Sequence, residues 1–319
     1  MTPIESSKQR FPGGITIIGT GRLGSSLALR LHSKGYTIKS LYNRNLESCE
    51  RIAGSVNAEI CNSFPLKRSD LGDLVFLCLP DNQIATFARQ VAQRLYGDMS
   101  IDEQNPDKRK GVGGNGNYLH PAWIHTSGAL PAEILEPLAR YRAGTASFHP
   151  IQTFSARNRK TAFDQCFITL QGNAGLCADL KLLVRAIGAR PLQVDRDQKS
   201  AIHLAAVFVC NFLAPLFDAS QTLLTESGTG VRARELFRPL VEQTVMGLLD
   251  NPPDEVLTGP ILRGDTETIS RHLELLSGHQ DLKTLYAELG RATLALAKRI
   301  EGRDSSRDNE LEIKLKRNQ

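Results

Sequence analysis

The feature that most constrains this chain is a glycine-rich run near its start, ITIIGTGRLG at residues 15–24. A β-rich stretch precedes the three glycines, and an amphipathic helical pattern follows them. In that context Gly19 permits a tight turn, Gly21 lets the backbone approach a pyrophosphate, and Gly24 lets helix and strand pack closely. The alternative is an ordinary glycine turn. We predict a dinucleotide-binding site with contacts from Gly19, Thr20, Gly21, Arg22, Leu23 and Gly24.

The end of the second predicted strand indicates which dinucleotide binds. NAD-binding domains place an acidic residue there, which contacts the ribose hydroxyls and repels an extra phosphate. This chain has YNRN at residues 42–45 and no acid before Glu47. A guanidinium pairs well with a 2′-phosphate, so we predict NADP, held by Asn43 and Arg44. The alternative for Arg44 is a solvated loop residue.

The order of hydrophobic patterns indicates two domains. Up to residue 195, short β-rich runs alternate with amphipathic stretches, which predicts a Rossmann-type α/β fold with a doubly wound, mostly parallel sheet. After residue 195 only helical patterns occur. We predict an NADP-binding domain at 1–195 with a mobile glycine-rich insertion at 97–118, an all-α substrate and dimerisation domain at 196–303, and a disordered tail at 304–319.

Composition argues against several classes of function. No apolar run approaches the ~18 residues of a membrane span, and the first residues lack a secretory signal. The six cysteines are scattered without a C-x-x-C pair, which favours reduced thiols over disulfides or a metal site. A net charge of +5 without clustered aromatics is weak evidence for nucleic acid. We expect a cytoplasmic protein that binds no membrane, nucleic acid or metal.

Polar segments follow several predicted strands, at the edge where an open sheet binds its ligands. Asp81 is expected to cap the helix that follows it. In HTSG at residues 125–128, hydroxyls and amides suit a substrate carboxylate or carbonyl, and helix capping is the alternative. His149 shapes the pocket floor or only forms a turn. The predicted contacts are, for the cofactor, Leu79 and Pro80 and, for the substrate, Ser127, Gly128 and His149.

A lysine and a histidine stand one helical turn apart in KSAIH at residues 199–203. On a regular helix Lys199 and His203 share a face, and Asn211 falls two turns further, within about 120° of Lys199. The run 204–216 is otherwise apolar, so we expect a largely buried helix whose polar groups contact cofactor or substrate. We predict Lys199, His203 and Asn211 as catalytic. The alternative is a solvated Lys199 with the other two bonded inside the core.

A sharp loop between two predicted helices carries TGPILRGD at residues 258–265. Its Arg263 is a predicted contact for an anionic substrate. The Arg-Gly-Asp triplet is not interpreted as an adhesion motif, because nothing else indicates an extracellular protein.

Together these motifs resemble a bacterial family of predicted NADP oxidoreductases, in which a Rossmann-like domain precedes a helical domain of unknown function. The resemblance rests on GTGRLG, LPD, HTSGAL, SFHPIQTF, K-x-x-x-H with Asn211, and TGPILRGD with His272. It spans residues 15–289 and leaves the insertion and the tail as additions.

More distantly the layout is similar to ketopantoate reductase, pyrroline-5-carboxylate reductase and the β-hydroxyacid dehydrogenases. In ketopantoate reductase and the hydroxyacid dehydrogenases, a lysine opening the interdomain helix donates the proton, with an asparagine one turn later. Lys199 matches that lysine, and His203 stands in the asparagine's place.

The sequence therefore predicts hydride transfer between NADP(H) and a small, anionic carbonyl, hydroxyl or imine substrate. Lys199 is the first choice for the acid, since a lysine desolvated beside another cationic group loses its proton more readily. His203 is the alternative acid, and Asn211 orients the substrate. A homodimer through the helical domain is expected. Rival interpretations are a non-catalytic NADP sensor and a basic binding module using residues 108–110.

Overall fold

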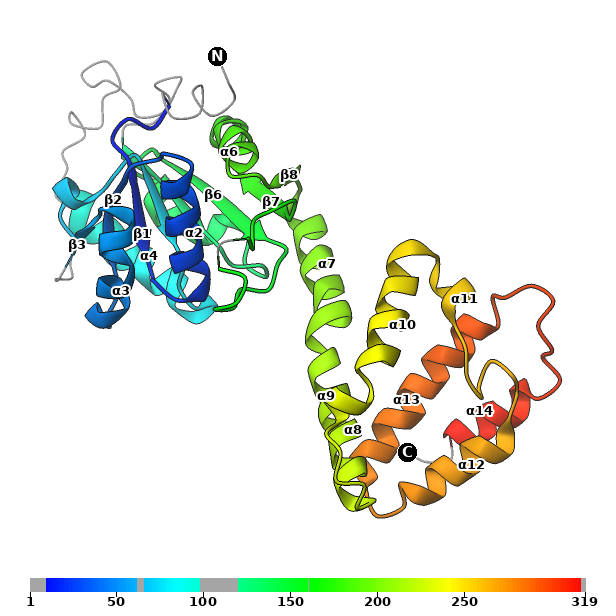
Figure 1. The fold of residues 1–319 in the computed structure, drawn as a ribbon. Helices are drawn as coiled ribbons and strands as arrows, with labels where there is room; N and C mark the ends of the chain where they lie inside the picture. The colour runs from blue at the N-terminus through cyan, green and yellow to red at the C-terminus, as the bar shows by residue number, and fades with distance from the viewer. Residues whose placement is uncertain (1–9, 62–65, 98–119, 160, 317–319) are drawn as a thin grey trace. The chain divides into compact units, whose positions relative to one another are not determined.

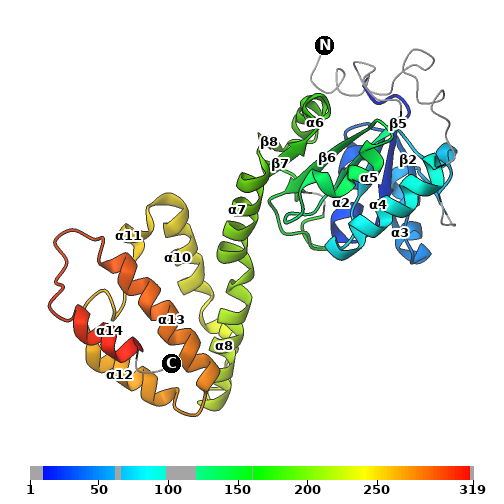
Figure 2. The ribbon, with the colours of Figure 1, turned by 180° about the vertical axis from the view of Figure 1, so that it is seen from behind.

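The computed structural model describes residues 10–61, 66–97, 120–159 and 161–316. The chain divides into two compact units, Met1–Phe208 and Val209–Gln319. Among the described residues, every strand belongs to the first unit, and the second consists of helices and loops (Figures 1 and 2). Apart from Gly97, the predicted insertion at 97–118 lies outside the described residues.

The first unit is built on an eight-stranded sheet in the order β3-β2-β1-β4-β5-β6-β7-β8. Neighbouring strands are parallel except β6 and β7, which are antiparallel. This arrangement confirms the predicted doubly wound α/β fold. The strands are β1 (Ile15–Ile18), β2 (Ile38–Tyr42), β3 (Glu59–Ile60), β4 (Leu74–Leu77), β5 (His120–His125), β6 (Ala143–Pro150), β7 (Phe167–Gly172) and β8 (Arg190–Gln193).

Apolar clusters lie on both faces of the sheet, as a parallel sheet requires. One face packs against α2, α3 and α6, and the other against α4, η4 and α5. Every residue of β1 and β4 is buried, which explains their almost continuous apolar sequences. The helices are α2 (Arg22–Ser33), α3 (Leu46–Val56), α4 (Asp81–Tyr96), η4 (Ala132–Leu135), α5 (Glu136–Ala139) and α6 (Ala174–Ala186), with the short η1 at Arg68–Asp70.

The predicted boundary near residue 195 marks the end of the sheet, but not the division between the units. Asp195 caps α7 (Arg196–Ala206) by accepting from the amide of Gln198, and α7 belongs to the first unit. A π-helical turn, Val207–Asn211, follows α7 and spans the division. The helix continues as α8 (Leu213–Glu226).

The second unit has a small apolar core between α12, α13 and α14. Its buried members are Ile261, Ile269, Leu273, Leu294, Leu311 and Leu315. The helices of the unit after α8 are α9 (Ala233–Leu236), α10 (Arg238–Asp250), α11 (Pro253–Val256), α12 (Thr266–Leu275), α13 (Gln280–Ala297) and α14 (Asp308–Lys316).

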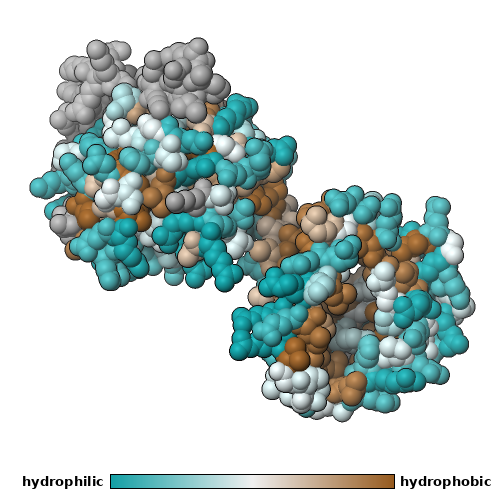
Figure 3. Space-filling model, viewed as in Figure 1, coloured by the Kyte–Doolittle hydropathy of each residue, from teal (hydrophilic) through white to brown (hydrophobic). Residues whose placement is uncertain are grey.

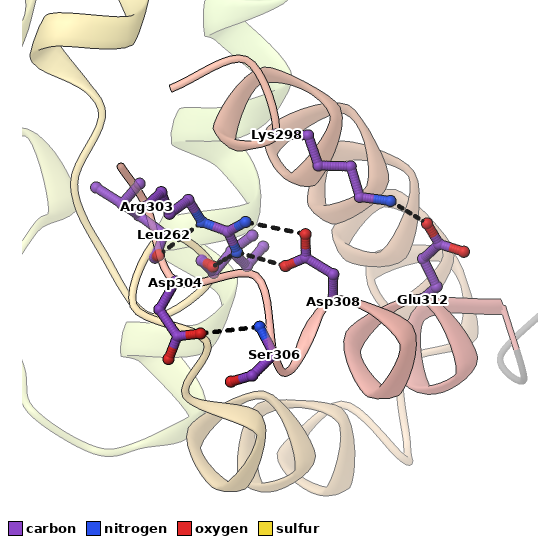
Figure 4. A network of polar contacts seen from close by, with 8 residues as sticks. Leu262, Lys298, Arg303, Asp304, Ser306, Asp308 and Glu312 are labelled. Carbon is purple, nitrogen blue, oxygen red and sulfur yellow. Dashed lines mark hydrogen bonds and ion pairs between the residues drawn. The ribbon is translucent and has the colours of Figure 1, made fainter. Parts of the chain in front are cut away.

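The expectation of a disordered tail is wrong for the residues of α14. Leu311 and Leu315 have no exposed surface. Arg303 donates to both carboxylate oxygens of Asp308, at 3.0 and 2.6 Å, and to the carbonyl oxygen of Leu262 at 3.0 Å (Figure 4). Few apolar residues lie in the tail, so the helix depends on packing against α12 and α13 that local sequence does not reveal.

The helix from Arg196 to Glu226 was expected to be buried, and it is not. By length and composition it is the one helix among the described residues that is apolar enough to cross a membrane, which by itself is weak evidence for a span. None of its most apolar 18-residue window is buried. Apolar patches are visible on the surface of the helical unit (Figure 3). Thirteen large apolar residues from Leu204 to Leu249 are exposed.

Candidate active site

Glycines shape the turn between β1 and α2. Gly19 has a φ of +94°, a conformation that favours glycine, and a Cβ there would overlap the carbonyl of Cys78. A Cβ on Gly24 would overlap the Gly19 carbonyl, whereas one on Gly21 would meet nothing within 4 Å. No side chain caps α2 and no acid lies in its first turn. The turn therefore presents open space and free amides to an anion, as a dinucleotide pyrophosphate requires.

A pocket of about 580 Å³ adjoins this turn, along the carboxyl ends of β1, β2 and β4. Asn43 donates from Nδ2 to Thr20 Oγ1 at 2.9 Å and so ties the end of β2 to the glycine turn. The exposed Arg44 lines the pocket, and no carboxylate is among the described residues around it. This donor set fits a 2′-phosphate better than bare ribose hydroxyls.

A second pocket of about 470 Å³ shares Gly21, Cys78, Leu79 and Pro80 with the first. It continues along the edge of the sheet past the ends of β5 and β6. The ends of five neighbouring strands thus form one ligand-binding edge. The predicted residues that line its far part are Ser127, Gly128, His149 and His203.

Asp81 also lines the second pocket, which corrects the interpretation of this residue as a helix cap. The cap position of α4 is Pro80, and Asp81 is the first helical residue, with no side-chain cap bond at this end. Its carboxylate therefore faces ligand space and acts electrostatically on Lys199.

Ser127 is held at three points in the turn after β5. Its amide donates to Nδ1 of His125 at 3.2 Å, and its Oγ accepts from the amide of Leu130 at 3.0 Å. Its carbonyl oxygen accepts from Nζ of Lys199 at 2.7 Å. Because the side chain also lines the second pocket, the turn presents one fixed hydroxyl to that pocket.

Lys199 is buried next to the second pocket, with 2% of its surface exposed. Burial lowers the pKa of its ammonium group to about 8, and the Asp81 carboxylate opposes that shift. The predicted direction is therefore confirmed, but the main cause is desolvation and not a cationic histidine. The Nζ atom of Lys199 contacts the carbonyl oxygen of Ser127, which lines the second pocket, and the catalytic role of Lys199 stays a prediction. The rival interpretation, a solvated lysine, is wrong.

His149 and His203 stand edge to face with ring centroids 5.7 Å apart. A Cβ on Gly128 would overlap Nδ1 of His203 and press on the His149 ring, so a larger residue at this position would have to displace these rings. Burial and the nearby Lys199 lower the pKa of His149 to about 4, and the ring stays neutral near pH 7. His149 thus supplies the second pocket with a neutral nitrogen donor or acceptor near Ser127.

Two predicted site residues are not part of this cluster. Asn211 is exposed, lies in the second unit and ends the π-helical turn. That turn is wider than an α-helical turn, so the two-turn spacing from Lys199 does not hold. Arg263 is also exposed in the second unit, between α11 and α12. Their proposed roles stay predictions.

The sequence interpretation missed two groups of residues. His125 was noted as part of a motif but not as a site residue. The α4 face at the first pocket was missed too, although a signal existed. On this amphipathic helix, uncharged polar residues recur at helical spacing along the face that lines the pocket, as Asn82, Gln83, Thr86 and Gln90.

The fold and the first pocket define a Rossmann-type dinucleotide-binding domain. Residues 14–106 match the family described as NADP oxidoreductase coenzyme F420-dependent, and residues 166–293 match a domain of unknown function, DUF2520. The two matches together cover most of the chain, and they agree with the predicted family, with NADP as the cofactor and with an oxidoreductase.

Solved structures share the fold over most of the chain. BF3122 from Bacteroides fragilis, a proposed NADP oxidoreductase, is 24% identical with a TM-score of 0.69, over 88% of this chain and 97% of that one. An imine reductase from Myxococcus stipitatus in complex with NADP⁺ is 16% identical with a TM-score of 0.58, over 93% and 99%. A reductive aminase from Aspergillus terreus, in complex with NADPH and ethyl-5-oxohexanoate, is 16% identical with a TM-score of 0.55, over 96% and 93%. No curated protein sequence matched the chain.

Proposed function

We propose that the protein transfers a hydride between NADP(H) and a small carbonyl, hydroxyl or imine substrate. The observation that carries this proposal is the continuity of the two pockets. One begins at Arg44 and the glycine turn, and the other continues from the same turn to Ser127, His149 and His203. NADPH, when bound, supplies the hydride. The imine reductase and the reductive aminase that share the fold support a carbonyl or imine as the acceptor.

The residues that line the second pocket, and Lys199, whose Nζ contacts the Ser127 carbonyl oxygen, have distinct roles in this proposal. Reduction of a C=O or C=N bond adds a hydride to carbon and a proton to the heteroatom. Lys199, with its pKa near 8, is a suitable acid close to neutral pH. Ser127 donates a hydrogen bond to the heteroatom, and Gly128, which lacks a side chain, leaves room for the His149 and His203 rings that line the same pocket. His203 is the alternative acid.

The proposal is tested by following NADPH oxidation with three kinds of substrate and identifying the product by mass spectrometry. The arms are 2-oxo acids, uncharged ketones given with a primary amine, and a cyclic imine such as 2-methyl-1-pyrroline. We expect reduction in at least one arm. A preference for the 2-oxo acids would support the anionic substrate predicted from Arg263. Tight NADPH binding without any turnover would favour the non-catalytic sensor.

We also propose that a second copy of the chain covers the exposed helical face. The apolar side chains exposed between Leu204 and Leu249 present on the order of 1,000 Å², close to one partner's share of a stable protein interface. Neither α8 nor α10 has a buried residue. A face of this size that the chain itself leaves open is typical of an isologous dimer. Association with lipid is the competing outcome of the test.

A further inference from the structure

His125 contacts Ser127, which lines the second pocket, but His125 itself is not part of the lining. The proposed function gives it no role. Its side chain has no exposed surface and both of its ring nitrogens contact the turn after β5, so it offers no group to a substrate. It ends β5 directly before the turn that carries Ser127. Its two ring nitrogens contact the two ends of that turn, since Nδ1 accepts from the Ser127 amide and Nε2 lies 3.2 Å from the carbonyl oxygen of Pro131.

These two contacts determine the tautomer of the ring. An amide only donates, so Nδ1 is the acceptor and carries no proton. A carbonyl oxygen only accepts, so Nε2 carries the proton. Burial and the nearby Lys199 lower the pKa of His125 to about 3, so the ring keeps this neutral form across the working range of the enzyme.

The contacts of Ser127 leave one group uncommitted. Its amide is bonded to His125, its carbonyl to Lys199, and one lone pair of Oγ to the Leu130 amide. Among the hydrogen bonds of the described residues, none uses the hydroxyl proton of Ser127. With 6% of the residue exposed at the second pocket, this proton is directed to a substrate atom with a lone pair.

We propose that His125 is a positioning residue, whose neutral imidazole clamps the 127–131 turn and thereby aims the Ser127 hydroxyl at the carbonyl oxygen or imine nitrogen of the substrate. The proposal rests on the hydride-transfer function given above. Lys199 supports the same turn from the carbonyl side, so the hydroxyl is fixed from both directions. A catalytic donor held to this degree acts without reorganising as charge develops on the heteroatom.

The test is a double-mutant cycle between His125→Phe and Ser127→Ala, measured in NADPH-dependent reduction of whichever probe turns over. We expect each single variant to lower kcat by about tenfold or more, with the Kd for NADPH unchanged. If His125 acts through Ser127, adding His125→Phe to Ser127→Ala causes no further loss. Multiplying losses would overturn the proposal.

Two further variants separate positioning from folding. His125→Asn keeps an acceptor for the Ser127 amide and should regain part of the lost kcat, whereas His125→Leu should not. Ser147→Ala is the matched control: Ser147 pairs with His125 across β5 and β6, is fully buried, and has no hydrogen-bond partner for its hydroxyl. It should keep full activity. Equal losses in Ser147→Ala and His125→Phe would overturn the proposal.

Amide hydrogen exchange of Ser127 provides a readout that needs no substrate. His125→Phe should speed this exchange by about tenfold or more, since the amide loses its acceptor. If the Ser127 amide exchanges at the same rate in His125→Phe as in the wild type, His125 does not hold the turn, and the proposal is overturned even if the wild-type enzyme turns over. Faster exchange in a protein that reduces no probe overturns the hydride-transfer function, and with it the catalytic purpose of Ser127, while the clamp itself stands.

Discussion

The two units of the chain bury their apolar residues to different extents. In the first unit, β1 and β4 are wholly buried between helices on both faces of the sheet. In the second, α8 and α10 have no buried residue, and the core is confined to the contacts of α12, α13 and α14. The first unit is thus packed on both faces of its sheet, whereas the second leaves apolar helix faces exposed, and we propose that a partner covers them. The five predictions that follow test this division of roles.

The largest effect is expected at the candidate acid. Lys199→Met keeps the length of the side chain but removes its proton, so turnover should fall by a factor on the order of 10² or more. Folding and the Kd for NADPH should change little, because the first pocket does not include Lys199. Steady-state kinetics with NADPH titrations measure both. Near-normal turnover in this variant, combined with loss of turnover in His203→Ala, would transfer the acid role to His203.

The dependence of kcat/KM on pH gives a second test of Lys199 as the acid. A donor with a pKa near 8 is protonated below that pH and loses its proton above it. The kcat/KM for reduction should therefore be level through neutral pH and fall about tenfold per unit above pH 8. Lys199→Met should lack this alkaline limb. A profile that stays level to pH 10 in the wild type would contradict the role of Lys199.

The proposed dimer is tested by introducing a carboxylate on the exposed apolar face of the second unit. Leu240 and Leu249 are 63% and 74% exposed, so glutamate at either position should leave the chain folded. Carboxylates buried against a second copy should weaken the dimer by at least tenfold. Sedimentation velocity at micromolar concentration measures the change. A wild-type monomer would contradict the dimer, and binding of the wild type to lipid vesicles would point to a membrane surface instead.

A smaller effect is expected at the first pocket. NADPH should bind at least an order of magnitude more tightly than NADH, and Arg44→Ala should erase most of that difference. The exposed Arg51 on α3, outside the pocket lining, offers a control, since Arg51→Ala should leave both affinities unchanged. Calorimetric titration with both cofactors gives the ratio. Equal affinities in the unmodified protein would contradict the role of Arg44.

The smallest effect is expected at the glycine-rich segment 97–118. Its apolar residues do not recur at the spacing of a helix or a strand. Replacing the segment by a short Gly-Ser linker should therefore leave solubility and NADPH binding nearly intact. Thermal unfolding and a binding titration of the shortened chain check this. Insoluble protein would mean that the segment is a structural element.

The cofactor half of the site was predictable because its constraints are local. Gly19 has a positive φ, Gly24 lies where helix and strand pack closely, and Arg44 comes two residues after the end of β2. Each of these demands acts within a few residues of the glycine run or the strand. Pattern and spacing alone therefore indicated NADP.

The substrate half depends on contacts between distant segments. Lys199 donates to the carbonyl oxygen of Ser127, which lies 72 residues earlier in the chain. The ring of His149 in β6 contacts the ring of His203 in α7. The motif at 125–128 therefore indicated a site, but it did not indicate that the buried His125 ring contacts both ends of the 127–131 turn. The helical spacing assumed for Asn211 does not hold, because a π-helical turn interrupts the helix and the sequence alone does not reveal it; its role stays a prediction.

If the two pockets together hold NADP(H) and its hydride acceptor, the hydride passes directly from the cofactor to the substrate carbon. This transfer is measured with NADPH deuterated at the transferable C4 position, with product analysis by mass spectrometry. We expect one deuterium on the carbon of the reduced C=O or C=N bond, and a loss of that product in Lys199→Met. Cofactor that binds tightly but passes no deuterium to any carbonyl or imine probe would contradict it.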